Sequence, residues 1–388
     1  MCRLKIKIRT LLLSLFFFTM LAAFALLLAL IDAEQSTHVI ALISLVILIG
    51  ALLFAIIFAI HTISHSILRI AHEIDQIATL HLEDDTKNGS RIEEMHLISH
   101  SVDSLKRSLR SFSRYVPKEI AQELMQKDHE ISLARTKKTI SILFTDITNF
   151  TSFAETLPIE TVNTLLTDYF EALSSIIGEC GGTIDKFIGD SIMSLWGALK
   201  EYPDATERAC TAALLCQKRL KILNEEHRKK GMPEFETRMG IKTGPVIVGN
   251  FGTSERMSYS AIGDAVNIAA RLQELNKTYH TQILIGEETM CMTKDAFLVR
   301  PLETVELRGR QQKIKVYELI AKKGGKQEIL PEEGQVELCA LFTRALHAFD
   351  QKDYETAKSC FQSLHKKFPN DYPTKLYIKK LEHLQPKK

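Results

Sequence analysis

The sequence predicts an α/β protein in which one mixed or antiparallel sheet, over residues 139–321, lies between two helical regions. Three observations lead to this prediction. Apolar runs of strand length alternate with amphipathic runs of helix length in the middle of the chain. Two long charge-free apolar segments occupy the first 60 residues, and helical apolar spacing recurs on both sides of the central body.

The composition argues against several classes of protein. The chain has 388 residues, a formal net charge of +2 and 7% aromatic residues, so nothing in it favours a nucleic-acid partner. Its seven cysteines include no CxxC pair and are odd in number, which disfavours both a zinc ribbon and a disulfide framework. We therefore interpret the cysteines as reduced packing residues of a cytosolic body.

Residues 11–60 predict a transmembrane hairpin. The segments 11–31 and 39–60 lack charged residues, and at about 1.5 Å per residue each spans a hydrocarbon core about 30 Å thick. The preceding residues 1–10 are basic and the link between the segments is acidic, which places both termini in the cytoplasm. The alternative for the first segment is a cleavable signal peptide. We expect a multi-pass protein of the inner (plasma) membrane with a cytoplasmic body.

Two apolar seams with alternating spacings of three and four follow over residues 61–115, separated by a polar connector. The first comprises Ile63, Ile67, Ile70, Ile74 and Ile77, and the second Met95, Ile98, Val102, Leu105, Leu109 and Phe112. This arrangement resembles the HAMP signal-relay module, which implies a parallel four-helix bundle in a dimer. The proline usual in the first HAMP helix is missing, and a plain coiled-coil spacer is the alternative. A charged linker, residues 116–138, follows.

The elements of the body are predicted in chain order from apolar periodicity and breaker residues. Strands are expected at 139–147, 235–244, 245–252 and 281–287, helices at 159–180, 205–227 and 265–275, and a hairpin at 183–197.

After a linker at 322–334, the tail 335–388 predicts helix, turn, helix and resembles a single tetratricopeptide-like unit. Ala357 and Phe361 would pack its second helix, and Pro369 would close it. One such unit cannot bury its own apolar face, so we expect it to dock on the body or on a second copy. A site for a protein partner is the alternative.

The first candidate site residue is Asp146, in ILFTDITNFTSF. An apolar strand ends there and a helical segment starts within Ile147, Thr148, Asn149, Phe150 and Thr151. A carboxylate followed by main-chain N–H groups at a helix start suits a cation and a phosphate together. Aspartate also caps helices routinely, so this motif alone proves little.

The hairpin TIDKFIGDSIMSLWG provides a second carboxylate, Asp190, in a Gly-Asp turn. A central position for the hairpin would bring this turn beside Asp146. Two carboxylates at adjacent strand ends suit a pair of Mg²⁺ or Mn²⁺ ions that bridge nucleotide phosphates. The alternative is two ordinary turn aspartates.

A third motif, YSAIGDAVNIAARL, places Asn267 and Arg271 four residues apart on one helix face, among alanines that let another surface come close. An amide and a guanidinium there can bind a ribose and a phosphate. The alternative is that Arg271 simply pairs with Glu274.

In this order and at these separations, FTDITNFT, DKFIGDSIMSLWG and YSAIGDAVNIAARL resemble the signature motifs of the class III nucleotide cyclases, the adenylate and guanylate cyclase family. The resemblance covers nearly all of the body. It implies a ferredoxin-like α+β unit, catalysis at a homodimer interface, and closure of ATP or GTP to a 3′,5′-cyclic monophosphate with loss of pyrophosphate.

The resemblance also implies roles for individual residues. Asp146, Asp190 and the main chain of Ile147 would hold two Mg²⁺ or Mn²⁺ ions, and the main chain of residues 147–151 would bind the β- and γ-phosphates. Asn267 would orient the ribose. Arg271 would stabilise the charge that develops on the α-phosphate.

Lys186 matches the family position that reads the purine. Its ammonium can donate to adenine N1 but not to guanine N1–H, and guanylate cyclases typically place a glutamate there. Ser260 matches the second such position, where adenylate cyclases more often have Asp or Thr; its hydroxyl can accept from the adenine 6-amino group. Arg310 and Arg256 are weaker candidates for triphosphate contacts, with solvated surface arginines as the alternative.

The sequence therefore predicts a membrane-anchored, homodimeric adenylate cyclase in signal transduction. Its expected partners are ATP, two divalent metal ions, a second copy and the membrane, with no nucleic acid, and the tail is a candidate site for a protein partner. A guanylate cyclase or a catalytically silent nucleotide-binding relay are the alternatives.

Overall fold

The computed structural model describes residues 37–79, 81–82, 93–113, 115, 135–253, 255–293, 295–306, 313–325 and 327–384, with 17, 19–21, 23 and 24 of the first apolar segment. It consists of two compact units, Met1–Glu130 and Ile131–Lys388. The first predicted membrane segment lies largely outside the described residues, as do Arg310 and most of the linker 116–138.

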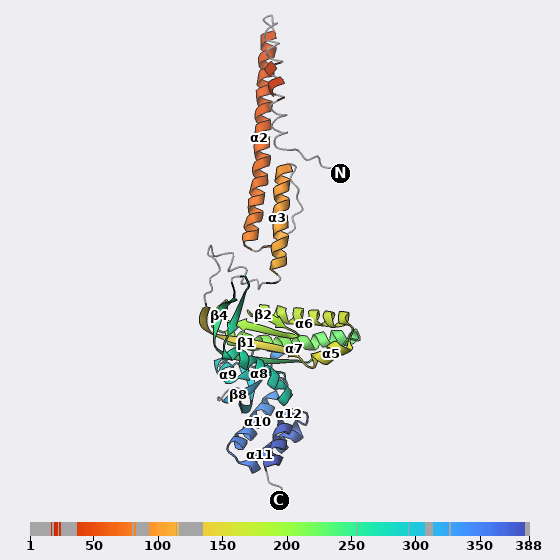
Figure 1. Ribbon diagram of the computed structural model, residues 1–388, viewed down its shortest axis with the longest axis vertical. Coiled ribbons are helices and arrows are strands. Elements are labelled where there is room, and N and C mark those ends of the chain that lie inside the picture. Colours follow the sequence, from red (N-terminus) through yellow and green to blue (C-terminus); the bar gives the residue numbers. More distant parts are fainter. Residues whose placement is uncertain are drawn as a thin grey trace. The chain divides into compact units, whose positions relative to one another are not determined.

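The first unit is helical (Figure 1). Helix α2 (Thr37–Ala78) runs without a break through the second predicted membrane segment and the first predicted relay seam. Its Ser44–Ala78 portion is long and apolar enough to cross a membrane, by length and composition. Helix α3 (Glu93–Phe112) packs beside α2 and buries Ile70 and Ile77, and the Arg110 guanidinium donates to the Leu82 carbonyl.

The second unit is built on an eight-stranded mixed sheet, in agreement with the predicted fold class. The strand order is β2-β3-β1-β4-β6-β8-β7, with β5 paired to β4; β4 and β6 are parallel and the other neighbours antiparallel. The strands are β1 (Arg135–Ile147), β2 (Thr183–Ile188), β3 (Ser191–Trp196), β4 (Thr237–Gly252), β5 (Met257–Ile262), β6 (Ile283–Gly286), β7 (Phe297–Glu306) and β8 (Lys313–Lys322).

The prediction of separate strands at 235–244 and 245–252 is wrong, because β4 runs continuously through Pro245. Pro245 lies opposite Thr139 of β1, and an extended chain accommodates the fixed φ of proline at the loss of one N–H donor. Strands β5, β7 and β8 were not predicted from the periodicity.

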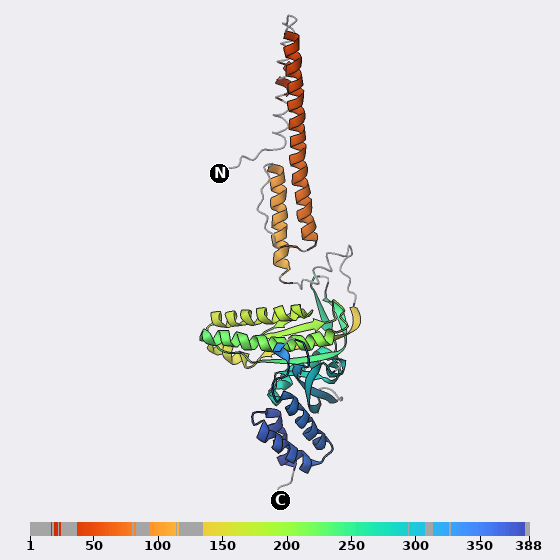
Figure 2. The same cartoon turned by 180° about the vertical axis from the view of Figure 1, so that it is seen from behind.

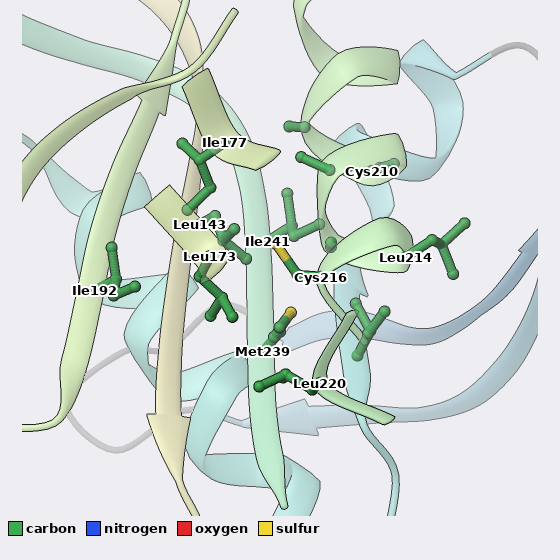
Figure 3. Close-up of a cluster of buried hydrophobic side chains, with 14 of the residues drawn as sticks. Leu143, Leu173, Ile177, Ile192, Cys210, Leu214, Cys216, Leu220, Met239 and Ile241 are labelled. Carbon is green, nitrogen blue, oxygen red and sulfur yellow. The ribbon is translucent and has the colours of Figure 1, made fainter. Parts of the chain in front are cut away.

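Side chains alternate between the two faces of the sheet, so neighbouring residues of one strand belong to different hydrophobic cores. Leu143 of β1 points into a cluster formed with α6 (Ile159–Glu179) and α7 (Ala205–Lys229), shown in Figure 3. Its neighbour Ile142 points to the other face, into a cluster that includes Ala265 and Ala269 of α8 (Asp264–Tyr279). Both α6 and α7 begin at the predicted residue, whereas α8 continues four residues past the predicted end.

The tail has three helices rather than the predicted two: α10 (Gln335–Asp350), α11 (Tyr354–Lys367) and α12 (Tyr372–Leu384). Asp371 caps α12 by accepting from the Thr374 amide at 3.1 Å, and Pro373 lies in the first turn. The three helices share one hydrophobic cluster with α8, β6, β7 and β8. Both ribbon views draw the tail helices next to this part of the unit (Figures 1 and 2). The tail therefore packs on the body of its own chain.

A buried ion-pair network joins tail and sheet. Arg300 of β7, only 3% exposed, donates to Glu318 of β8 at 2.8 Å and to Asp371 at 2.7 Å. Its guanidinium also lies 4.9 Å from the ring centre of Phe342 in α10. Because these partners come from three elements, Arg300 links the edge of the sheet to two tail helices.

Candidate active site

The structure brings the two predicted metal-binding carboxylates together. Strand β3 pairs antiparallel with β1, so the turn that precedes β3 lies at the end of β1, where Asp146 is located. Asp190 Oδ2 accepts from the Ile147 amide at 3.0 Å, and Ser191 Oγ donates to Asp146 Oδ1 at 3.3 Å. Two strand ends thus present carboxylates side by side.

The donor chemistry of this pair fits a divalent cation. Burial, and next the negative charge of Asp146, raise the pKa of Asp190, so its carboxylate lies where an added positive charge is stabilising. Mg²⁺ and Mn²⁺ prefer oxygen ligands and usually keep ligands from bound phosphates. Two carboxylates and the Ile147 carbonyl would supply part of the shell, and a triphosphate the remainder.

Two further residues contact Asp146 that the sequence reasoning missed. Gln273 of α8 donates through Nε2 to Asp146 Oδ2 at 3.1 Å, and Arg238 of β4 places Nη2 3.8 Å from the same oxygen. Arg238 lies opposite Asp146 in the β1–β4 register and is 7% exposed; its Nε has no hydrogen-bond partner in the described part of the chain. The available signal was a basic residue at the start of the apolar run of β4, which also contains Lys242.

Two of the main-chain N–H groups that are predicted to bind phosphate already donate hydrogen bonds within the chain. The Ile147 amide donates to Asp190, and the Thr148 amide donates to the Glu236 carbonyl at 2.7 Å. Asn149 then adopts a left-handed conformation with φ of 57°, and α5 (Phe150–Thr156) begins. The predicted phosphate site would therefore use the N–H groups of residues 149–151.

Asn267 and Arg271 are directed away from their own chain's carboxylates. Both lie on α8, the helix whose Gln273 contacts Asp146. At about 100° per residue, Arg271 is about 200° and Asn267 about 120° around the helix from Gln273. Asn267 is exposed and Arg271 half-buried. One chain therefore does not combine the amide and guanidinium pair with its own Asp146.

Lys186 and Ser260, which are predicted to read the purine, both contact the same side chain, that of Asp185. Asp185 Oδ2 accepts from Ser260 Oγ at 3.0 Å and lies 3.3 Å from Lys186 Nζ. Sequence reasoning did not single out Asp185. Arg256 lies in the exposed β4–β5 turn, where its amide donates to Thr253 Oγ1 at 3.3 Å, and its side chain is exposed.

A family model and several known proteins match this chain. Residues 133–321 match the family model "Adenylate and Guanylate cyclase catalytic domain". "Adenylate cyclase 1" of Rhizobium meliloti (strain 1021) is 32% identical over 274 residues, covering 71% of this chain and 41% of that protein. The chain thus spans about two fifths of this relative, which is substantially longer.

Two solved structures are also similar. The adenylyl cyclase CyaB from P. aeruginosa is 32% identical, and the match covers 51% of this chain and all of that chain, with a TM-score of 0.47. A bacterial light-regulated adenylyl cyclase is 23% identical over 68% of this chain and 72% of that chain, with a TM-score of 0.53, which supports the fold. Through residues 133–321, and by its sequence identity to named cyclases, the chain belongs to the adenylate and guanylate cyclase family.

Proposed function

We propose that this chain is a membrane-anchored adenylate cyclase that works as a homodimer and converts ATP to 3′,5′-cyclic AMP and pyrophosphate. The observation that carries the proposal is the division of the site within one chain. Asp146 and Asp190 meet at the end of β1, while α8 turns Asn267 and Arg271 away from them. Two copies facing each other would complete two sites from these halves.

Exposed apolar side chains on the second unit support such a contact. Phe187 and Ile188 lie exposed at the tip of the β2–β3 hairpin, and Ile247 and Ile262 form an exposed cross-strand pair on β4 and β5. Exposed apolar patches on a folded domain commonly mark a surface that another protein covers. The proposed partner is a second copy of the chain.

In the proposed reaction, the ribose 3′-hydroxyl loses its proton to solvent and its oxygen forms a bond to the α-phosphorus, while the bond from that phosphorus to the oxygen that bridges it to the β-phosphate breaks, and pyrophosphate leaves. Divalent metal ions, held by Asp146, Asp190 and the Ile147 carbonyl, would lower the pKa of the 3′-hydroxyl and neutralise the triphosphate.

The chain's own residues position the substrate. Arg238, whose Nε lacks a partner in the described residues, would bind a phosphate oxygen beside Asp146. Residues 149–151 would donate main-chain N–H groups to the β- and γ-phosphates. Asn267 of the facing copy would orient the ribose, and its Arg271 would stabilise charge on the α-phosphate, so catalysis rests mainly on positioning and electrostatics.

The preference for ATP is proposed from Lys186 and Ser260. Lys186 is a hydrogen-bond donor for adenine N1, whereas guanine presents a donor at that position. Because the matched family model covers both adenylate and guanylate cyclases, the family match does not choose the purine. A guanylate cyclase is the second candidate and would show a preference for GTP in the same assay.

The membrane anchor and the relay are part of the proposal. Helix α2 supplies one segment suited to a membrane, and residues 11–31 would supply the other. Helices α2 and α3 would form the HAMP-like relay between the membrane and the cyclase unit.

Complementation between inactive variants tests the shared site. We expect Asp146→Ala and Arg271→Ala each to abolish most activity of the full-length protein in membranes. Their co-expression should restore about a quarter of it, because about half of randomly formed dimers are mixed and each has one intact site. Co-expression of Asp146→Ala with Asp190→Ala is the matched control, since both changes affect the same half. Equal recovery in both mixtures, or none in either, contradicts the shared site.

A further inference from the structure

Asp185 occupies an irregular position in the hairpin. The β2–β3 register pairs Ile184 with Ser194 and Lys186 with Met193, so Asp185 is the extra residue of a β-bulge. In a regular strand, Asp185 and Lys186 would point to opposite faces of the sheet. The bulge re-aims them, and the two neighbouring side chains form an ion pair at 3.3 Å.

The Asp185 carboxylate is buried although the lysine beside it is not. Its side chain has no exposed surface, whereas that of Lys186 is 44% exposed. Burial raises the pKa of Asp185, while Lys186 and the Ser260 hydrogen bond oppose that effect. Its second oxygen, Oδ1, is buried without a hydrogen-bond partner among the residues that the structure describes. A half-satisfied buried carboxylate is costly, and such groups often persist for a functional reason.

The hydrogen bond between Ser260 and Asp185 determines whether the serine hydroxyl can still donate to another group. A serine hydroxyl has one hydrogen to donate and two lone pairs that accept, and it rotates to suit its partner. Ser260 Oγ donates to Asp185 Oδ2 at 3.0 Å. A carboxylate can only accept, so the serine hydrogen is committed and the oxygen can only accept from any further partner.

From this geometry we propose that Asp185 determines the purine selectivity of the enzyme, by holding the Ser260 hydroxyl as an obligate acceptor and the Lys186 ammonium beside it. The proposal rests on the proposed cyclase function. Adenine offers a donor at its 6-amino group and an acceptor at N1, which this acceptor and donor pair matches. Guanine offers the opposite pattern, with an acceptor at O6 and a donor at N1. A freely rotating serine would donate to guanine O6, and Asp185 prevents that rotation.

Asp185 is thus a positioning residue that acts through Ser260 and Lys186. An interpretation in which Asp185 only stabilises the fold through its ion pair predicts equal losses for both nucleotides. Selectivity between ATP and GTP therefore separates the two interpretations, because it is a ratio in which effects on folding and on the metals cancel.

The test compares kcat/KM for ATP and for GTP in the full-length protein with Mn²⁺, with cyclic AMP and cyclic GMP measured separately. We expect Asp185→Asn to lower the ratio of kcat/KM for ATP to that for GTP by about 10-fold or more, because the amide can turn its NH2 group toward Ser260, which then accepts from the amide and has its hydrogen free to donate to guanine. The double variant Asp185→Asn, Ser260→Asp should recover the wild-type ratio to within about 3-fold, because an acceptor-only group then faces the base directly.

A matched control is available on the other face of the sheet. Asp168 of α6 lies 3.2 Å from Nε2 of the fully buried His227, so Asp168→Asn also removes a carboxylate from a buried polar partner. Its ratio should stay that of the wild type. If Asp185→Asn does not fold, the double variant carries the test, and loss of its ATP preference overturns the proposal. An unchanged ratio in folded Asp185→Asn also overturns it. A wild-type protein that forms neither cyclic nucleotide instead contradicts the proposed function.

Discussion

The two helical regions that flank the cyclase unit satisfy their apolar faces in different ways. In the tail, Phe342, Phe361 and Tyr377 are buried in one cluster with strands of the body. In the N-terminal unit, Ile70 and Ile77 are buried between α2 and α3, but Ile67 and Ile74, of the same seam, are each 51% exposed. The apolar residues of the tail are covered within one chain, whereas Ile67 and Ile74 of the N-terminal unit are left exposed.

Similar helical patterns can therefore either pack against the body of the same chain or leave apolar residues exposed. The apolar spacing is alike in both regions, but only the tail meets a sheet edge with matching apolar residues and a buried arginine. We infer that the tail is a structural part of the cyclase unit, whereas Ile67 and Ile74 of α2 stay exposed within one chain.

The largest expected effect comes from removing each region in turn. A chain of residues 131–388 should unfold cooperatively, because the second unit keeps its cores. A chain of residues 131–325 should be unfolded or aggregated, because residues such as Leu302 and Val316 lose their cover at about 1.5–3 kcal/mol per side chain, against a total stability of about 5–15 kcal/mol. Circular dichroism during heating checks this expectation. Equal melting temperatures for the two chains contradict a structural tail.

A smaller effect is expected from the ion-pair network that joins tail and sheet. Arg300→Met should lower the free energy of unfolding by about 3–5 kcal/mol, because Glu318 and Asp371 would remain buried without a cation. Lys315→Met is the matched control: its pair with Glu287 is exposed on both sides, so the variant should unfold close to the wild type. Urea unfolding of both variants measures the difference. Similar values would show that Arg300 does not hold the tail.

The smallest expected effect is a difference in labelling rate between two thiols, which involves no loss of stability. Cys339 of α10 packs against Leu298 and Ala321, and burial raises the pKa of its thiol to about 11. Thiol reagents react with the thiolate, so at pH 8 Cys339 should stay unlabelled while the exposed Cys291 reacts. Mass spectrometry after brief labelling distinguishes the two. Rapid labelling of Cys339 in the folded protein would indicate that α10 leaves the sheet.

Much of the cyclase unit could be predicted because its local signals are strong. Helices α6 and α7 have long, regular apolar faces, and the Gly-Asp turn defines the hairpin. Strands β5, β7 and β8 were missed although burial alternates along much of β7 and β8, because charged residues such as Arg300 and Glu318 interrupt their apolar runs and only tertiary packing buries these residues. The third tail helix was missed although Asp371 and Pro373 mark its start.

The residues of the candidate site also fall into two groups, those that the sequence predicted and those that it did not. Asp146, Asp190, Asn267 and Arg271 lie in contiguous motifs whose chemistry is legible from spacing. Arg238 and Asp185 lie in strands that contain other polar residues, so nothing in the sequence singles them out, and their relevance depends on what lies opposite them. Arg238 faces Asp146 only through the β1–β4 register, and Asp185 reaches Ser260, 75 residues away, only through a bulge.

Residue type and local periodicity are enough to predict the kind of protein, because the order of its motifs, the charge-free segments and the helical tail can all be read without a structure. Tertiary structure was needed to show that the tail is part of the cyclase unit, that Asn267 and Arg271 point away from Asp146, and that Asp185 joins Lys186 to Ser260. The physical reason is that local spacing sets which face of an element a side chain occupies, whereas strand pairing and packing between distant segments set what that face meets.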